Sequence, residues 1–213
     1  MFKKKYYLCK KITKMGNQQL YTLKNCELQV VLSLYLGDGC FISNKANTSA
    51  AIATSCKYEE YLLYKKNLIS TLDNSNVSYI TNNGYKNSFI YKWKINQSPY
   101  LKEIEQIPLI DKLEILDELG LALWFYDDGS LHKSKYFYNL NTHAFSLEDQ
   151  YLFLDKLSKY GINAKIYKDR KKDGREFFYL SIGKHQGSSI ISDFLNKINI
   201  DCYKYKRWSS STS

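Results

Sequence analysis

Two short apolar runs that both end in Asp-Gly constrain this chain more than any other feature. VLSLYLGDG at residues 31–39 and LALWFYDDG at residues 121–129 carry apolar side chains at helical spacing and stop at a glycine. Their last acids, Asp38 and Asp128, lie 90 positions apart. The same spacing relates further identical pairs: Gly39 and Gly129, Tyr61 and Tyr151, Leu62 and Leu152, and Lys94 and Lys184. We interpret the chain as an internal duplication.

The two halves of the chain repeat one order of elements. In the first half, 27–37 predicts a helix, 40–46 and 49–55 a hairpin, 58–72 a helix, 77–83 and 88–96 a second hairpin, and 99–106 a short helix. In the second half, 117–128 predicts a helix, 131–138 and 139–145 a hairpin, 146–160 a helix, 163–170 and 175–182 a hairpin, and 187–198 a helix. The sequence therefore predicts an α+β fold of two pseudo-symmetric αββαββα units.

The boundaries of the predicted parts follow from this repeat. We expect a basic N-terminal arm at 1–26, a first half at 27–107 and a linker at 108–116. The second half then covers 117–206, and a flexible Ser-rich tail covers 207–213.

The charge of the chain favours a polyanionic partner. Lys and Arg number 31 against 21 Asp and Glu, a net charge of +10, of which +8 falls in residues 1–106 and +2 in residues 107–213. No apolar run is long enough to span a membrane, and the basic start MFKKKYYLCKKITK lacks a following apolar core. We therefore expect a soluble protein without a secretory signal or a membrane partner.

Several other chemistries lack their sequence signals. The five cysteines are scattered and never spaced as CxxC, which argues against a disulfide framework or structural zinc and favours a reducing, intracellular setting. The three histidines lack metal-ligand spacing with cysteine, and neither GxxxxGK[ST] nor GxGxxG occurs. No Ser or Cys sits in a recognisable nucleophile motif.

The acids at the two helix ends have two interpretations. Each can be a surface residue beside a C-terminal glycine cap, which is common at helix ends. A carboxylate there opposes the helix dipole at about 0.3–1 kcal/mol, and the second run places Asp127 beside Asp128. A divalent cation would relieve this conflict, since hard cations take carboxylate and carbonyl oxygens together. The repetition of the pattern favours the metal interpretation.

The two runs resemble the paired motifs of LAGLIDADG homing endonucleases in their single-chain form. The resemblance covers about residues 27–206, and WFYDDG with the following LNTHAFS is its more specific part. It implies that each unit is a four-stranded antiparallel sheet with helices on one face, that the motif helices pack at the interface, and that the sheets saddle DNA. The family's small residues at the helix contact are replaced here by Leu32, Ser33, Ala122 and Leu123, which predicts less close helix packing.

The resemblance also implies the roles of particular residues. It assigns Asp38 and Asp128 as catalytic metal ligands, with the carbonyls of Gly37 and Asp127 as further ligands and Mg²⁺ or Mn²⁺ as the cofactor. Lys94 and Lys184, predicted at the ends of the fourth strands, resemble the basic residues of the family's active-site pocket. The alternative for each lysine is a solvated charge at a strand end.

Strand alternation predicts a surface that reads DNA. In 131–145 it turns Leu140, Thr142 and Ala144 inward and Asn139, Asn141 and His143 outward. Asn can read adenine, while Lys and Arg can read guanine or hold phosphate. We assign the remaining contacts to basic and polar residues along the predicted hairpins and near the C-terminus: Ser43, Lys45, Lys86, Lys92, Lys94, Lys133, Lys135, Lys165, Arg170, Lys171, Lys172, Arg175, Lys204 and Lys206.

These interpretations converge on a site-specific, double-stranded DNA endonuclease of intron or intein type. We expect a monomer that hydrolyses one phosphodiester per strand of a long, imperfectly palindromic target. The resemblance implies cutting across the minor groove to leave short 3′ overhangs. The alternative is an RNA-binding maturase that assists splicing of its host intron. We expect either protein inside a mitochondrion or chloroplast, or in bacterial or phage cytoplasm.

Overall fold

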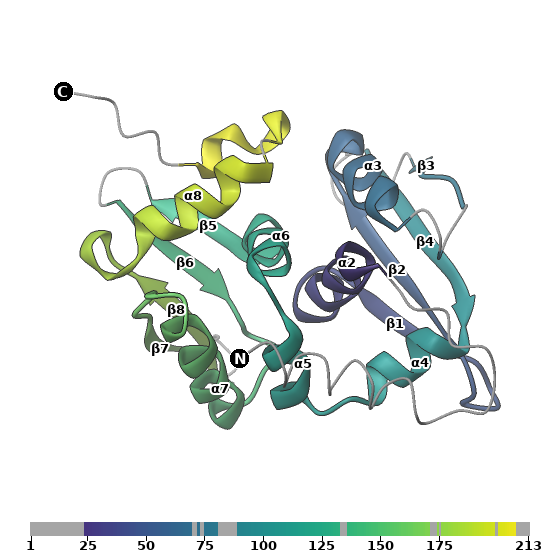
Figure 1. Cartoon of the computed structure of the whole chain (residues 1–213), viewed down its shortest axis with the longest axis horizontal. Coiled ribbons are helices and arrows are strands. Elements are labelled where there is room, and N and C mark those ends of the chain that lie inside the picture. Colours follow the sequence, from purple (N-terminus) through teal and green to yellow (C-terminus); the bar gives the residue numbers. More distant parts are fainter. Residues whose placement is uncertain are drawn as a thin grey trace.

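The computed structural model describes residues 24–69, 72, 75–80, 89–132, 136–170, 174, 176–198 and 200–207 (Figure 1). The first unit runs in the order α2 (Asn25–Leu36), β1 (Cys40–Ser43), β2 (Ala50–Cys56), α3 (Glu59–Leu68), β3 (Ser78–Ile80), β4 (Ile90–Ser98) and α4 (Pro99–Gln106). After α5 (Leu109–Ile115), the second unit consists of α6 (Glu118–Asp128), β5 (Gly129–His132), β6 (Phe137–Asn141), α7 (Leu147–Ser158), β7 (Lys165–Arg170), β8 (Glu176–Ile182) and α8 (Ser188–Ile198). Two 3₁₀ segments, η1 (Lys184–Gln186) and η2 (Asp201–Lys206), flank α8.

The two units have the same sheet topology. Their strand orders are β1-β2-β4-β3 and β5-β6-β8-β7, and all pairings are antiparallel. Figure 1 shows α2 and α6 side by side at the centre, with one sheet on each side of the pair. The predicted α+β class and the two αββαββα units are therefore confirmed.

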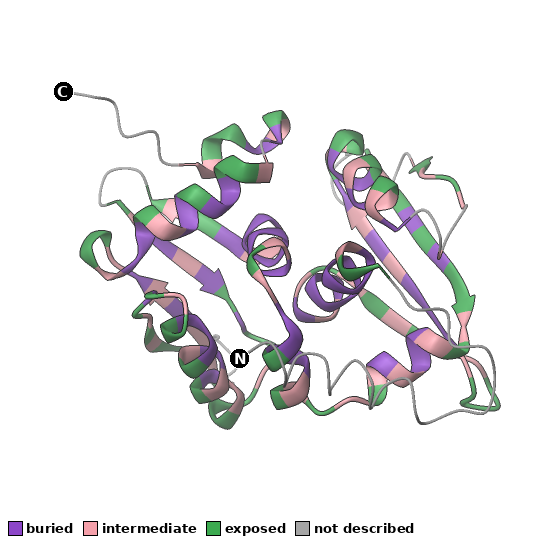
Figure 2. Ribbon diagram, in the orientation of Figure 1, coloured by how far each residue is buried: buried purple, intermediate pink, exposed green. Residues whose placement is uncertain are grey.

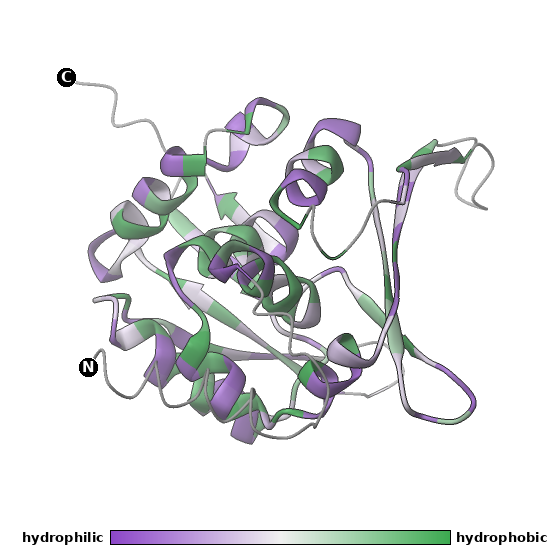
Figure 3. Ribbon diagram, turned by 45° about the vertical axis from the view of Figure 1, so that its right-hand side comes forward, coloured by the Kyte–Doolittle hydropathy of each residue, from purple (hydrophilic) through white to green (hydrophobic). Residues whose placement is uncertain are grey.

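The central helices are buried around their circumference. Val30, Val31 and Leu34 of α2 are fully buried, as are the residues from Leu121 to Tyr126 of α6. Figure 2 shows this burial. In Figure 3, hydrophobic residues gather on the same pair of helices, while the outer helices carry both hydrophobic and hydrophilic residues. Each helix thus packs against its own sheet on one side and against the other unit on the other.

Close contacts join the two central helices at both ends. A Cβ added at Gly120 would lie 2.5 Å from Oε1 of Gln29, which also accepts a hydrogen bond from the Asp117 amide at 2.8 Å. A Cβ added at Gly37 would lie 2.8 Å from the Cβ of Asp127. Glycine at these two positions allows the close approach of the helix ends.

Three sequence expectations differ from the structure. The segment 108–116 expected as a linker contains helix α5, which begins after Pro108. The hairpin expected at 131–145 is shorter, because β5 ends at His132 and β6 ends at Asn141. As a result, Ala144 lies in an exposed turn instead of facing inward, whereas Leu140 and Thr142 are buried as expected.

Within the described chain, no helix is long and apolar enough to cross a bilayer.

Candidate active site

The C-terminal ends of α2 and α6 meet at the boundary between the two units. Both helices end at a glycine whose amide donates to the preceding turn, from Gly37 to the Ser33 carbonyl at 2.9 Å and from Gly129 to the Phe125 carbonyl. Asp38 follows Gly37 in the turn before β1, and Asp128 is the last residue of α6, directly before β5. The repeated Asp-Gly pattern therefore brings two acids from distant sequence positions to one place.

The side chain of Asp127 is bound to the first unit. Its carboxylate oxygens each lie 2.7 Å from Nζ of Lys65, a fully buried residue of α3. The hydroxyl of Tyr61 also donates to Asp127 Oδ1 at 2.7 Å. This carboxylate is thus committed to a buried ion pair, and only the backbone carbonyl of Asp127 is available as a ligand.

The pKa values of the two remaining acids, Asp38 and Asp128, are both raised. Burial raises the pKa of Asp128 to about 7, and the neighbouring carboxylates of Asp38 and Asp127 add to the shift. Burial also raises the pKa of Asp38, with a further contribution from Asp127, although part of this residue is exposed. Such coupling between carboxylates creates a place where positive charge is stabilised.

A lysine near the C-terminus enters this cluster. Lys206 donates from Nζ to the Tyr126 carbonyl at 2.6 Å and lies 3.4 Å from the Asp127 carbonyl, so it caps the end of α6. Its ammonium also lies 4.8 Å from the ring centroid of Tyr203. Burial lowers the pKa of Lys206, while the carboxylates of Asp127, Asp38 and Asp128 oppose that shift. Sequence reasoning placed this lysine only near the DNA backbone.

The indole of Trp124 is a buried donor close to Asp128. Trp124 is fully buried, and its Nε1 has no hydrogen-bond partner of ordinary geometry within the described chain. The indole N–H still lowers the pKa of the Asp128 carboxyl slightly, so the two groups are close. This donor suits an ionised Asp128 better than a protonated one.

The donor set around the acids is small. No group of three or more His, Cys, Asp or Glu side chains with metal-binding geometry occurs in the part of the chain that the structure describes. Asp38 and Asp128 are the available carboxylates, and the carbonyls of Gly37 and Asp127 are the backbone oxygens beside them. Two carboxylates with carbonyls and water are typical of Mg²⁺ sites, which retain several waters.

The structure separates the two lysines that were predicted as an equivalent pair. Lys94 lies in the middle of β4, where it pairs with Ala53 and is exposed on the face away from the helices. Lys184 lies beyond the end of β8 in η1, with its ammonium 5.2 Å from the Tyr136 ring centroid. By strand register, Ser181 holds the position equivalent to Lys94. The expected placement at a strand end is therefore wrong for Lys94, whereas Lys184 follows closely after the end of β8.

Many predicted DNA contacts share one face of each sheet, which we call the outer face because the helices cover the other. Asn139 and Lys165 both pair with Ser181. These three residues alternate along their strands with residues such as the buried Leu140 and Leu180, so they lie on the opposite face of the sheet. Lys92, Lys94, Asn141 and Lys165 are exposed, and Asn139 is half-buried. His143 is exposed in the turn after β6, where its ring contacts Phe177 and Tyr179.

Other predicted contacts lie elsewhere. The hydroxyl of Ser43 donates to Glu105 at 3.0 Å and accepts from Lys102 at 2.8 Å, so it faces α4 and not the outer face. Lys45 is exposed in the β1–β2 turn, and Lys204 is exposed on η2. A further group lies outside the described residues, or in the case of Arg170 has an undescribed side chain: Lys86, Lys133, Lys135, Arg170, Lys171, Lys172 and Arg175.

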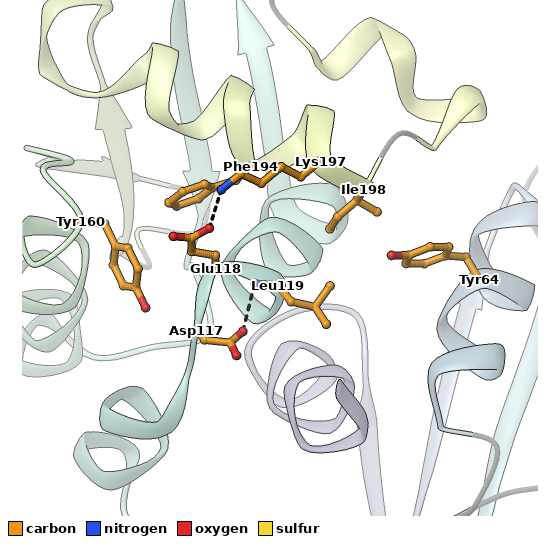
Figure 4. Close-up of a pocket in the computed structure, with 8 residues that line it drawn as sticks. All are labelled: Tyr64, Asp117, Glu118, Leu119, Tyr160, Phe194, Lys197 and Ile198. Atoms are coloured by element: carbon orange, nitrogen blue, oxygen red, sulfur yellow. Dashed lines mark hydrogen bonds and ion pairs between the residues drawn. The ribbon is translucent and has the colours of Figure 1, made fainter. Parts of the chain in front are cut away.

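A hollow of about 530 Å³ lies at the opposite end of α6 from the acids (Figure 4). Tyr64 faces it from α3, and Tyr160, Phe194 and Ile198 face it from the second unit. Its acids are already engaged, because Asp117 accepts from the Leu119 amide at 3.0 Å and Glu118 pairs with Lys197 at 2.7 Å. An eleven-residue helix separates this hollow from Asp128 by about 16 Å, so it is not part of the acid cluster.

A family model agrees with this arrangement of paired motif helices. The model of the LAGLIDADG DNA endonuclease family matches residues 28–190. The chain belongs to this family. Both Asp-Gly motifs lie within the matched region, as the resemblance of the sequence to LAGLIDADG homing endonucleases implies.

A relative that matches part of the chain is a DNA endonuclease by name. "Probable intron-encoded DNA endonuclease 3" of Mycosarcoma maydis is 36% identical over 61 residues, which is 28% of this chain and 45% of that protein. The chain therefore aligns with less than half of the length of this relative.

Solved structures in the family share the fold at low sequence identity. The homing endonuclease I-WcaI bound to its DNA recognition sequence superposes with a TM-score of 0.74 at 16% identity, over 94% of this chain and 97% of that one. A variant of I-DmoI, in complex with nicked target DNA and Mn, gives a TM-score of 0.56 at 12% identity, over 81% and 96% of the two chains. The LAGLIDADG fold of two sheets flanking paired helices is thus established for this chain.

Proposed function

We propose that this chain is a site-specific endonuclease that hydrolyses one phosphodiester in each strand of a DNA duplex. The observation that carries the proposal is the meeting of Asp38 and Asp128, two acids from equivalent helix ends, at the boundary between two equivalent units. Family membership and the DNA-bound neighbours support duplex DNA as the partner. Two units with the same fold also suit a duplex, because the strands of a duplex are related by two-fold axes.

The residues around the acids fit a divalent cation such as Mg²⁺ or Mn²⁺. Asp38 and Asp128 would hold it, with the carbonyls of Gly37 and Asp127 as further ligands. Repulsion from the neighbouring carboxylates contributes to the raised pKa of Asp128. Added positive charge relieves this repulsion. A bound divalent cation supplies Lewis-acid stabilisation of phosphate charge and lowers the pKa of water. The Mn in the I-DmoI complex is consistent with this choice.

The protein's own groups would prepare this site in two ways. Lys65 neutralises Asp127, which leaves the charge of Asp38 and Asp128 for the cation and the substrate. Lys206 holds the end of α6 through the Tyr126 carbonyl and presents its ammonium beside both acids. A fixed positive charge at that point favours the binding of a phosphate and stabilises charge that develops on it during hydrolysis. Water would serve as the nucleophile.

The outer faces of the two sheets would contact the duplex. Lys92 and Lys94 of the first sheet and Asn139, Asn141 and Lys165 of the second are placed for contacts with bases or phosphates. Because the outer faces differ in their side chains, we expect an imperfectly palindromic target and binding as a monomer. The relatives reported above are DNA endonucleases by name, so an RNA-binding maturase is not the favoured function.

Selection from a randomised duplex library tests the proposal. The protein is incubated with the library in Mg²⁺, and the cut ends are sequenced. We expect double-strand ends that share one long, imperfectly palindromic site and that disappear when EDTA replaces Mg²⁺. Failure to cut any duplex in either Mg²⁺ or Mn²⁺ would contradict the proposal.

A further inference from the structure

The outer face of the first sheet combines small side chains with lysines. Ala53 and Ser55 of β2 lie opposite Lys94 and Lys92 of β4 in the strand register. Ala51, Lys45 and Lys94 help to line a hollow of about 530 Å³ on this face. The small residues leave room, and the long lysine side chains supply positive charge around it.

The outer face of the second sheet carries aromatic side chains in addition to Lys165. Tyr167 and Tyr179 pair across β7 and β8, and their rings stack with centroids 5.6 Å apart. Phe177 lies on the same face with its ring 4.3 Å from that of His143, and Asn141 pairs with Tyr179. Tyr167 is 47% exposed. Among the described residues, the outer face of the first sheet carries no aromatic side chain.

These two surfaces suit different base pairs in a major groove. Thymine alone presents a methyl group there, which apolar and aromatic side chains contact, and Asn forms paired hydrogen bonds with adenine. An A·T pair therefore matches both Asn141 and its aromatic neighbours. Lysine only donates, and its preferred base partner is guanine.

The stacking of the aromatic residues favours a duplex over unpaired bases. Since Tyr167 and Tyr179 stack on each other, one face of each ring is already covered. A protein that binds single strands on a sheet presents free ring faces on which bases stack. Partly covered rings contact methyl groups in a groove without needing a free face.

We infer that the half of the target under the second sheet is rich in A·T pairs and is recognised through thymine methyl groups. The half under the first sheet contains G·C pairs that Lys92 and Lys94 recognise. This inference rests on the proposed function, and it adds the base composition of each half-site and the chemical group that is read.

The experiment starts from the cleavable site selected as above. The half-site under the second sheet is identified as the half in which Asn141→Ala relaxes base preference, and Lys94→Ala should relax the other. Deoxyuridine then replaces thymidine in one half at a time, which removes the methyl group and keeps base pairing. Affinity is measured in EDTA by fluorescence anisotropy. We expect a loss of about threefold for each contacted methyl in the second-sheet half, and no change in the other half.

Two variants of one residue link the loss to the aromatic face. Tyr167→Ala should reduce the deoxyuridine penalty in that half, whereas Tyr167→Phe keeps the ring and should retain it. Equal penalties in both halves, or an unchanged penalty in Tyr167→Ala, would overturn the inference while leaving the endonuclease proposal intact. Tighter binding to single-stranded RNA of the same sequence would also overturn it. If no duplex is cut or selected, the proposed function fails and the inference fails with it.

Discussion

Lys65 and Asp127 form a buried ion pair that joins the two units of the molecule. Nζ of Lys65 lies 2.7 Å from both carboxylate oxygens, and each side chain is 1% exposed. Lys65 belongs to α3 of the first unit, and Asp127 lies in the last turn of the motif helix of the second. The pair fixes the end of α6 against the first unit, next to Gly37, and so sets the relative position of Asp38 and Asp128.

Breaking this pair from one side should destabilise the protein strongly. Lys65→Met leaves a buried carboxylate without its cation, for which we expect a loss of about 3–5 kcal/mol in the free energy of unfolding. The double variant Lys65→Met with Asp127→Asn removes the unpaired charge and should recover most of that loss. Urea denaturation of the three proteins in EDTA measures the effect. A single variant as stable as the wild type would show that the pair does not hold the units together.

The raised pKa of Asp128 predicts a pH dependence of stability. Its folded value of about 7 lies above the ordinary value of 3.8, so ionisation is less favourable in the folded, metal-free protein than in the unfolded chain. This group therefore lowers stability progressively as pH rises from about 4 to about 7, and no further above that. Since Asp128 is half-buried, we expect about 1–3 kcal/mol after allowance for solvent screening.

The variant Asp128→Asn isolates this contribution from those of other groups. In EDTA, the difference in unfolding free energy between the variant and the wild type should grow in favour of the variant between pH 5 and pH 8. Addition of Mg²⁺ at pH 8 should stabilise the wild type and not the variant. A difference that stays constant with pH would show that Asp128 keeps an ordinary pKa.

Lys206 should contribute to cutting more than to DNA affinity. Lys206→Met removes a charge-assisted hydrogen bond and the positive charge beside the acids. We expect single-turnover cutting to slow about tenfold to a hundredfold, which corresponds to a loss of about 1.5–3 kcal/mol in transition-state stabilisation. Lys206→Arg keeps the charge and should restore part of the rate. The control Lys197→Met removes one positive charge near the other end of α6, where Lys197 pairs with Glu118. Equal cutting by the Lys206→Met and Lys197→Met variants would contradict a role at the acids.

The sequence predicted the elements that local pattern determines. Helical periodicity and Asp-Gly endings located α2 and α6 and both acids. The helix predicted at 146–160 corresponds to α7, which begins with a capping box formed by Ser146 and Asp149. The 90-residue spacing held at the motifs but failed farther along the chain. Tyr61 is 1% exposed and binds Asp127, whereas Tyr151 is 60% exposed, because loops of different length separate the later elements.

The missed residues depend on contacts between distant parts of the chain. Lys65 is one of two adjacent lysines on α3, and only the packing of α3 against α6 makes it the partner of Asp127. Lys206 lies in a segment that follows the last helix, and only its path back to α6 brings it to the Tyr126 carbonyl. Neither position carries a local sequence signal, since a lysine in a helix or near a terminus is usually solvated.

The cutting activity of single acid variants on the selected site tests the central claim most directly. Wild type, Asp38→Asn and Asp128→Asn are compared for double-strand cutting in Mg²⁺ and for binding of the same duplex in EDTA. Our account predicts that either substitution abolishes double-strand cutting while affinity changes by less than about threefold, because each removes the charge of one ligand and leaves the outer faces unchanged. Full double-strand cutting by either variant in Mg²⁺ would contradict the account.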